Sequence, residues 1–148
     1  MGGLALFGMT KTLLLSSLLV VAALATTAAT APDAKLTAST QIEQGKKLYT
    51  DNCSKCHGAA GQGTKEAPAV VGKAAFPLEP RAKAKRDVKF HTAADVFAWA
   101  SKNMPAKKPG SLTTDQYLAI FAFDLTANGI KLDAPLDADA ATKIVLHP

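Results

Sequence analysis

The sequence has few of the residues that usually anchor a small protein, with only two cysteines and nine aromatic residues among its 148 residues. Two cysteines cannot form a framework of several disulfides, and they are too few for a four-cysteine zinc site. The sequence also lacks a G-x-x-x-x-G-K-[ST] phosphate loop and a basic run interleaved with aromatic residues. Nucleotide binding through such a loop and nucleic-acid binding are therefore not indicated. The length favours a single domain with a limited hydrophobic core.

The charge is mildly basic, with 17 lysines and arginines against 12 aspartates and glutamates and a net charge of +5. A balance of this kind suits docking on acidic protein surfaces and says little about the fold. No Ser/His/Asp set or pair of catalytic carboxylates stands out. The sequence therefore gives no indication of hydrolytic catalysis.

Both cysteines lie in one motif, Cys53-Ser54-Lys55-Cys56-His57. The pattern C-x-x-C-H is typical of covalent attachment of a c-type haem, in which each thiol adds to one vinyl group. The imidazole of His57 can then lie under the iron as the proximal ligand. The alternatives are a disulfide, a zinc site or a thioredoxin-like redox motif. Zinc would require four ligands, and the βαβ context of thioredoxin is missing. The motif predicts one covalent haem c.

Beyond this motif, residues 41 to 129 resemble a class I, single-haem cytochrome c. The resemblance rests on the haem motif and on a set of glycine, proline, methionine and asparagine positions around it: Gly45 with Tyr49, Gly58, Gly61-Gln62-Gly63, Ala67-Pro68-Ala69, Asn103-Met104-Pro105 and Asn128-Gly129. It implies an all-α cytochrome c fold, in which three to five short helices wrap around one covalently attached haem. The cytochrome c domain is expected to span residues 41–130.

The resemblance also implies two further site residues. The Pro68 carbonyl would accept the Nδ1 proton of His57, a contact that fixes the tautomer and orientation of a ligand histidine. Met104 stands at the position of the second axial ligand, since His/Met is the ligand set of cytochromes c. An ordinary proline turn and a gap-filling core methionine are the alternatives. His91 and His147 are rival ligands that lie in no ligand motif.

The first 25 residues have the layout of a signal peptide or an N-terminal membrane anchor. Lys11 is followed by an uncharged stretch from Thr12 to Pro32, and Ala23-Leu24-Ala25 fits an A-x-A cleavage site. Without cleavage, residues 12–32 could associate with a membrane. Residues 26–40 are expected to be a linker. The expected location is the periplasm or the outer face of the cytoplasmic membrane.

Three of the expected helices can be placed in the sequence. The first runs from about Gln41 to Asp51, capped by Thr40 with Glu43, and its Gly45 would allow close approach of the last helix. The second is capped by Thr92 and runs from Ala93 to about Asn103. The last is capped by Thr113 with Gln116 and stops at Asn128-Gly129.

Two stretches are expected to lack long regular elements. The segment Lys73 to Lys89 is rich in basic residues and prolines and is expected to be a loop. The simplest interpretation is that its basic side chains are solvated. The alternative is that one of them contacts a haem propionate, or that the loop steers an acidic partner. Residues 131–148 form a C-terminal tail whose apolar patch, Ile144 to Leu146, would fold back on the domain or meet a partner.

These features predict a one-electron carrier rather than an enzyme. Its partners would be redox proteins such as a dehydrogenase, a quinol-oxidising complex, an oxidase or a photosynthetic centre. The alternative is a permanent electron-accepting subunit of a dehydrogenase or other membrane redox complex, because the Asn103–Pro105 segment, the Pro109–Leu112 turn and the last helix are similar to cytochrome subunits of periplasmic dehydrogenases. A haem enzyme or gas sensor is the third class considered.

Overall fold

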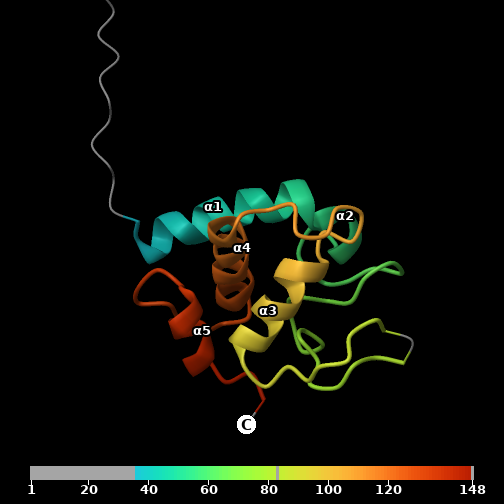
Figure 1. Ribbon diagram of the computed structural model, residues 1–148. Coiled ribbons are helices and arrows are strands. Elements are labelled where there is room, and N and C mark those ends of the chain that lie inside the picture. The colour runs from blue at the N-terminus through green and yellow to red at the C-terminus, as the bar shows by residue number, and fades with distance from the viewer. Residues whose placement is uncertain (1–35, 83, 148) are drawn as a thin grey trace, which may run out of the picture. The chain divides into compact units, whose positions relative to one another are not determined.

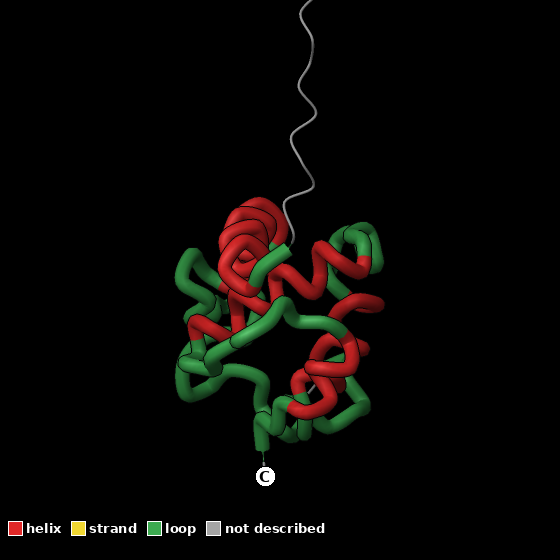
Figure 2. The backbone as a smooth tube through the Cα atoms, turned by 90° about the vertical axis from the view of Figure 1, so that its left-hand side faces the viewer, coloured by secondary structure: helices red, strands yellow, loops and turns green. Residues whose placement is uncertain are grey.

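The computed structural model describes residues 36–82 and 84–147, and these residues form five helices, α1 to α5. The expected leader, residues 1–25, lies outside the described residues, and so does the expected linker up to residue 35. Figure 2 shows helices joined by long loops in the described part, where the one β-type contact is an isolated bridge between Thr92 and Val145. The all-α class is confirmed. No helix of this part combines the length and the apolar character needed to cross a bilayer.

Helix α1 (Ala38–Asn52) begins earlier than the sequence indicated. Its N-cap is Thr37, whose side chain accepts a hydrogen bond from the backbone of Thr40, and Thr40 returns the contact in a capping box. The prediction that Thr40 caps the helix with Glu43 was therefore wrong, and residues 38–40 are helical rather than linker. The earlier start places Gln41 inside the helix, where its side chain is only 3% exposed.

Helices α1 and α4 (Thr114–Ala127) pack directly against each other, and Figure 1 shows α1 running across α4. Gly45 makes this close approach feasible, because a Cβ atom at this position would overlap the backbone carbonyl of Ala119. One turn further along α1, the ring of Tyr49 lies 5.4 Å from that of Phe123, centroid to centroid. The predicted contact between Gly45 and the helix capped by Thr113 is confirmed.

The N-cap residues Thr92 and Thr113 are those expected from the sequence. In α3 (Ala93–Asn103), Thr92 forms a capping box with Asp95. In α4, Thr113 forms one with Gln116. Satisfying the free N–H groups of the first turn in this way stabilises a helix by about 1 kcal/mol per cap. The chain leaves α4 at Gly129, whose φ of 85° is the left-handed conformation expected for a helix stop.

The C-terminal tail folds back on the domain and contains a short helix, α5 (Ala138–Lys143). The buried Gln41 side chain donates to the Leu136 carbonyl at 2.9 Å and accepts from the Leu136 N–H at 2.7 Å. Further along, the Leu146 N–H donates to the His91 carbonyl. The tail thereby contributes to the same hydrophobic core as α3 and α4, which includes Phe90, Val96, Leu118, Phe121, Leu125, Leu136 and Ala141.

Candidate functional site

The C-x-x-C-H motif forms a single helical turn at the end of α1. Cys53 is the C-cap of α1 and the N-cap of α2 (Ser54–His57), and its carbonyl accepts from the N–H groups of Cys56 and His57 at 3.1 and 3.0 Å. Residues three and four apart on such a turn lie on the same side. The two free thiols and the imidazole are therefore gathered on one side of the turn, and all three residues are half-buried.

The loop after His57 is closed by hydrogen bonds to the backbone of the motif. The Gly63 N–H donates to the His57 carbonyl at 2.7 Å, and the Thr64 hydroxyl donates to the Cys56 carbonyl at 2.5 Å. A Cβ atom on Gly63 would lie 2.7 Å from the Ala69 nitrogen. Glycine is thus needed here because residues 67–69 pass directly beside the loop.

This packing brings Pro68 to the proposed proximal ligand. The Nδ1 atom of His57 lies 2.7 Å from the Pro68 carbonyl oxygen. A carbonyl can only accept, so Nδ1 carries the proton and donates. The tautomer is then fixed, and the lone pair of Nε2 is left for a metal. The hydrogen bond that the resemblance implied is present.

On the other side of the motif, α1 fastens the same backbone. The hydroxyl of Tyr49 donates to the Gly58 carbonyl at 2.8 Å, one residue beyond His57. Tyr49 is 2% exposed, and burial raises the pKa of its hydroxyl to about 12, with smaller contributions from Asp124 and Cys53. The hydroxyl therefore remains a donor at neutral pH.

Met104 lies at the end of α3, where it is the C-cap with an extended backbone, φ −115° and ψ 157°. Its N–H still donates to the Ala100 carbonyl of the helix, at 2.8 Å. Its carbonyl accepts from the Tyr117 hydroxyl of α4 at 2.5 Å and from the Gly110 N–H at 3.2 Å. As predicted, the residue before Pro105 has left the helix, and it is held on a turn between α3 and α4.

A buried carboxyl that sequence reasoning missed lies near the motif. Asp124 on α4 is 4% exposed, and its Oδ1 atom has no hydrogen-bond partner among the described residues. Burial raises the pKa of this carboxyl well above its usual value. Asp124 follows Ile120 and Phe121 at helical spacing, so the core stripe of α4 itself could have identified it.

Burial also raises the pKa of the Cys53 thiol to about 12, and the Asp124 charge and Cys56 act in the same direction. Burial is the largest cause of this shift. Burial also favours the neutral form of Asp124, which weakens the effect of its charge on Cys53. The thiol is consequently protonated at neutral pH.

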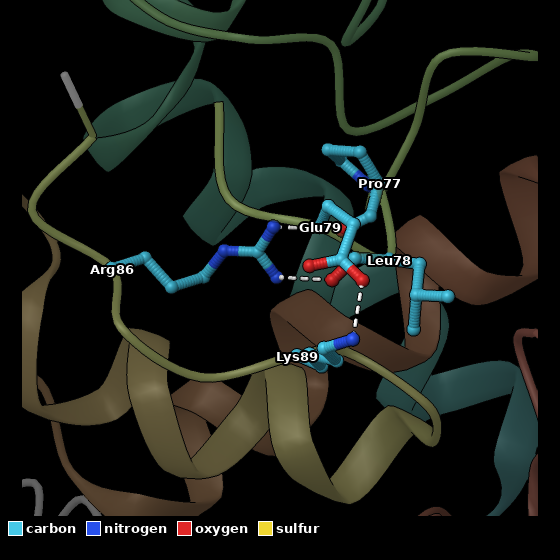
Figure 3. Close-up of polar contacts among 5 residues, drawn as sticks. All are labelled: Pro77, Leu78, Glu79, Arg86 and Lys89. Carbon is cyan, nitrogen blue, oxygen red and sulfur yellow. Dashed lines mark hydrogen bonds and ion pairs between the residues drawn. The ribbon is translucent and has the colours of Figure 1, made fainter. Parts of the chain in front are cut away.

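The basic loop is more ordered than its composition suggested. Arg86 is 8% exposed and donates to the carbonyls of Pro77 at 2.8 Å and Leu78 at 3.3 Å, as Figure 3 shows. Its guanidinium carbon lies 3.7 Å from the centroid of the Phe90 ring. Arg86 thus stabilises the loop and is not one of the solvated side chains expected there, whereas Lys89 forms an exposed ion pair with Glu79.

The rival histidines are placed differently from His57. The Nε2 atom of His147 donates to the Phe76 carbonyl at 2.7 Å. His91 is exposed, and its carbonyl accepts from the backbone of the C-terminal tail. The structure therefore brings together Cys53, Cys56, His57 and Pro68, while Met104 is presented separately from the end of α3.

Comparisons with known proteins agree with this arrangement. The family model described as "Cytochrome c" matches residues 42–126. A solved structure, the sulfane dehydrogenase SoxCD from Paracoccus pantotrophus, is similar with a TM-score of 0.55 and 28% sequence identity, over 71% of this chain and 52% of that chain. The present chain thus spans about half of the length of that one. No curated protein sequence gives a significant match. The family match covers more than half of the chain, which belongs to the cytochrome c family.

Proposed function

We propose that this chain binds one haem through thioether bonds from Cys53 and Cys56, with His57 and Met104 as the axial ligands. In this role it relays single electrons between redox proteins of the periplasm or the outer face of the cytoplasmic membrane. Electron transfer through a c-type haem is the function of the family to which the chain belongs. The number of haems, the ligands and the partners are the proposed part.

The observation that best supports this assignment is the 2.7 Å contact between His57 Nδ1 and the Pro68 carbonyl. It leaves Nε2 as the metal-binding atom and strengthens the imidazole as a ligand. Two free thiols on the same helical turn provide the attachment points. The residues present therefore fit a porphyrin bound at the motif.

The roles of the residues follow from their chemistry. When bound, the haem supplies an iron that changes valence by one electron. His57 is a nitrogen ligand, and Met104 would be a soft thioether ligand that favours ferrous iron and raises the reduction potential. With both axial positions filled, the ligand set remains the same in the two valence states. Such a site suits electron transfer rather than turnover of a substrate at the iron.

Replacement of Met104 tests the ligand assignment. Met104→Ala should abolish the long-wavelength sulfur-to-iron band of the oxidised protein and lower the reduction potential, because the thioether is lost. His91→Ala and His147→Ala are the matched controls, and both should retain the band. Survival of the band in Met104→Ala would rule out Met104 as the ligand. A vacant sixth position in the unmodified protein would instead favour the haem enzyme or sensor class.

The second candidate function is a permanent electron-accepting subunit of a dehydrogenase or other membrane redox complex. It is favoured by the similarity to a structure of sulfane dehydrogenase SoxCD, in which this chain corresponds to about half of the matched chain. Gel filtration of native extract, followed by haem staining, separates the two candidates. A carrier elutes at the size of the single chain, and a subunit elutes together with its partner.

A further inference from the structure

The two tyrosines of the sequence make the same kind of contact, each to the backbone of a different proposed ligand segment. Tyr49 of α1 donates to the Gly58 carbonyl, next to His57. Tyr117 of α4 donates to the carbonyl of Met104 itself, at 2.5 Å. Both side chains are buried, with exposures of 2% and 5%. Each hydroxyl therefore fastens the backbone of one proposed ligand segment to a helix of the α1–α4 pair.

The Met104 segment depends on this contact more than the His57 segment does on Tyr49. Among the described residues, the Met104 peptide has two further backbone contacts, its N–H to Ala100 and its carbonyl to the Gly110 N–H. The Gly110 contact is internal to the loop, so it closes the loop without attaching it to the rest of the domain. Among the described residues, the hydrogen bond from the Tyr117 hydroxyl is what joins the Met104 peptide to α4.

We propose that Tyr117 is a positioning residue for Met104, and that its hydrogen bond keeps the thioether on the iron against competing ligands. The inference rests on the proposed function, in which Met104 is an axial ligand. An outside ligand can bind the iron only in the minor state in which Met104 has swung away. Its apparent affinity is the intrinsic affinity multiplied by the population of that open state.

Tyr117→Phe removes the hydroxyl and keeps the ring, so the packing of α4 is preserved. Loss of one hydrogen bond should raise the open population by about 2- to 12-fold. Because the Met104 carbonyl retains the Gly110 donor, the lower half of this range is expected. The measurement is a titration of the oxidised holoprotein with imidazole, followed by the loss of the sulfur-to-iron band. The variant should bind imidazole more tightly by this factor.

Tyr49→Phe is the matched control, because it also deletes a buried hydroxyl that donates to a backbone carbonyl. Imidazole affinity should rise less in this variant than in Tyr117→Phe, because Tyr49 contacts the His57 segment and not the Met104 peptide. Equal affinities for Tyr117→Phe and the unmodified protein would overturn the proposal, and so would an equal rise in both variants, which would indicate a general loss of stability. Absence of the sulfur-to-iron band in the unmodified protein would instead contradict the ligand assignment.

A second measurement avoids substitution altogether. In the reduced, diamagnetic holoprotein, the hydroxyl proton of Tyr117 should exchange slowly with water and show a nuclear Overhauser contact to Pro105. A hydroxyl proton in rapid exchange would contradict the proposal even if Tyr117→Phe did not accumulate as holoprotein.

Discussion

The buried carboxyl of Asp124 leads to a prediction about how stability depends on pH. Asp124 is 4% exposed, and its Oδ1 atom lacks a partner among the described residues. Burial raises the pKa of the carboxyl in the folded protein well above the usual value of 3.8. In the unfolded chain the group is hydrated and titrates near that usual value. Folding therefore favours the protonated form.

The sign of the effect follows from the number of bound protons. Between the unfolded and the folded pKa, the folded state binds one proton that the unfolded state does not. The free energy of unfolding should then fall by about 1.4 kcal/mol for each pH unit gained in this range. The stabilisation is fully present below pH 3.8 and is lost as the pH rises through the folded pKa.

Asp124→Asn replaces the carboxyl by a neutral group of the same shape and removes this titration. The stability of the variant relative to the unmodified holoprotein should increase steadily with pH above about 4, with the slope given above. The assay is urea unfolding of both proteins at a series of pH values. Asp115→Asn, at an exposed position of the same helix, makes the same change in net charge and serves as the control.

Three outcomes would refute this reasoning. A stability difference that is constant between pH 4 and 8 would show that Asp124 does not bind a proton on folding. A slope of the opposite sign would show that a positive group stabilises its carboxylate. The same slope in Asp115→Asn would assign the effect to net charge and not to burial.

Two further predictions concern the packing of α1. Gly45→Ala gains about 1 kcal/mol of intrinsic helix preference. Its Cβ atom must displace the backbone carbonyl of Ala119, and a net loss of about 1–2 kcal/mol in urea unfolding is expected. The exposed neighbouring variant Gln44→Ala should change stability little, and a stabilised Gly45→Ala would contradict the packing argument. Gln41→Leu leaves both backbone groups of Leu136 without their partner, which should cost about 2–4 kcal/mol and speed proteolysis of the tail. Unchanged proteolysis would show that the tail is held by its apolar contacts alone.

Local sequence signals predicted local structure well. The N-cap Thr92 and the capping box of Thr113 with Gln116 were both identified, because a cap and its partner lie only three residues apart. At the first helix the same rule failed. Thr40 followed by Glu43 matched the usual pattern, whereas the structure uses Thr37 with Thr40. The earlier start is coupled to the burial of Gln41, a contact across 95 residues that no local pattern contains.

The residues of the candidate site could be predicted where they belong to a recognisable sequence motif. The haem motif identified Cys53, Cys56 and His57, and the resemblance pointed to the Pro68 carbonyl. The supporting roles of Tyr49 and Tyr117 were not identified, since the partners of their hydroxyls lie on other elements. Arg86 was missed because charged residues are seldom buried and only the tertiary structure shows its partners, whereas Asp124 could have been found from its helical spacing to Ile120 and Phe121.

The supporting contacts also explain how two ligand segments without long helices of their own can be held rigidly. His57 ends a helix of four residues, and Met104 stands just beyond the end of α3. The hydroxyls of Tyr49 and Tyr117 attach these two segments to α1 and α4, and those helices meet where Gly45 contacts the backbone of the other. The spacing of the proposed ligands is therefore set by a helix–helix contact rather than by the loops. If His57 and Met104 bind the iron as proposed, a spacing fixed in this way would change little with the valence of the iron, which is what rapid electron transfer requires.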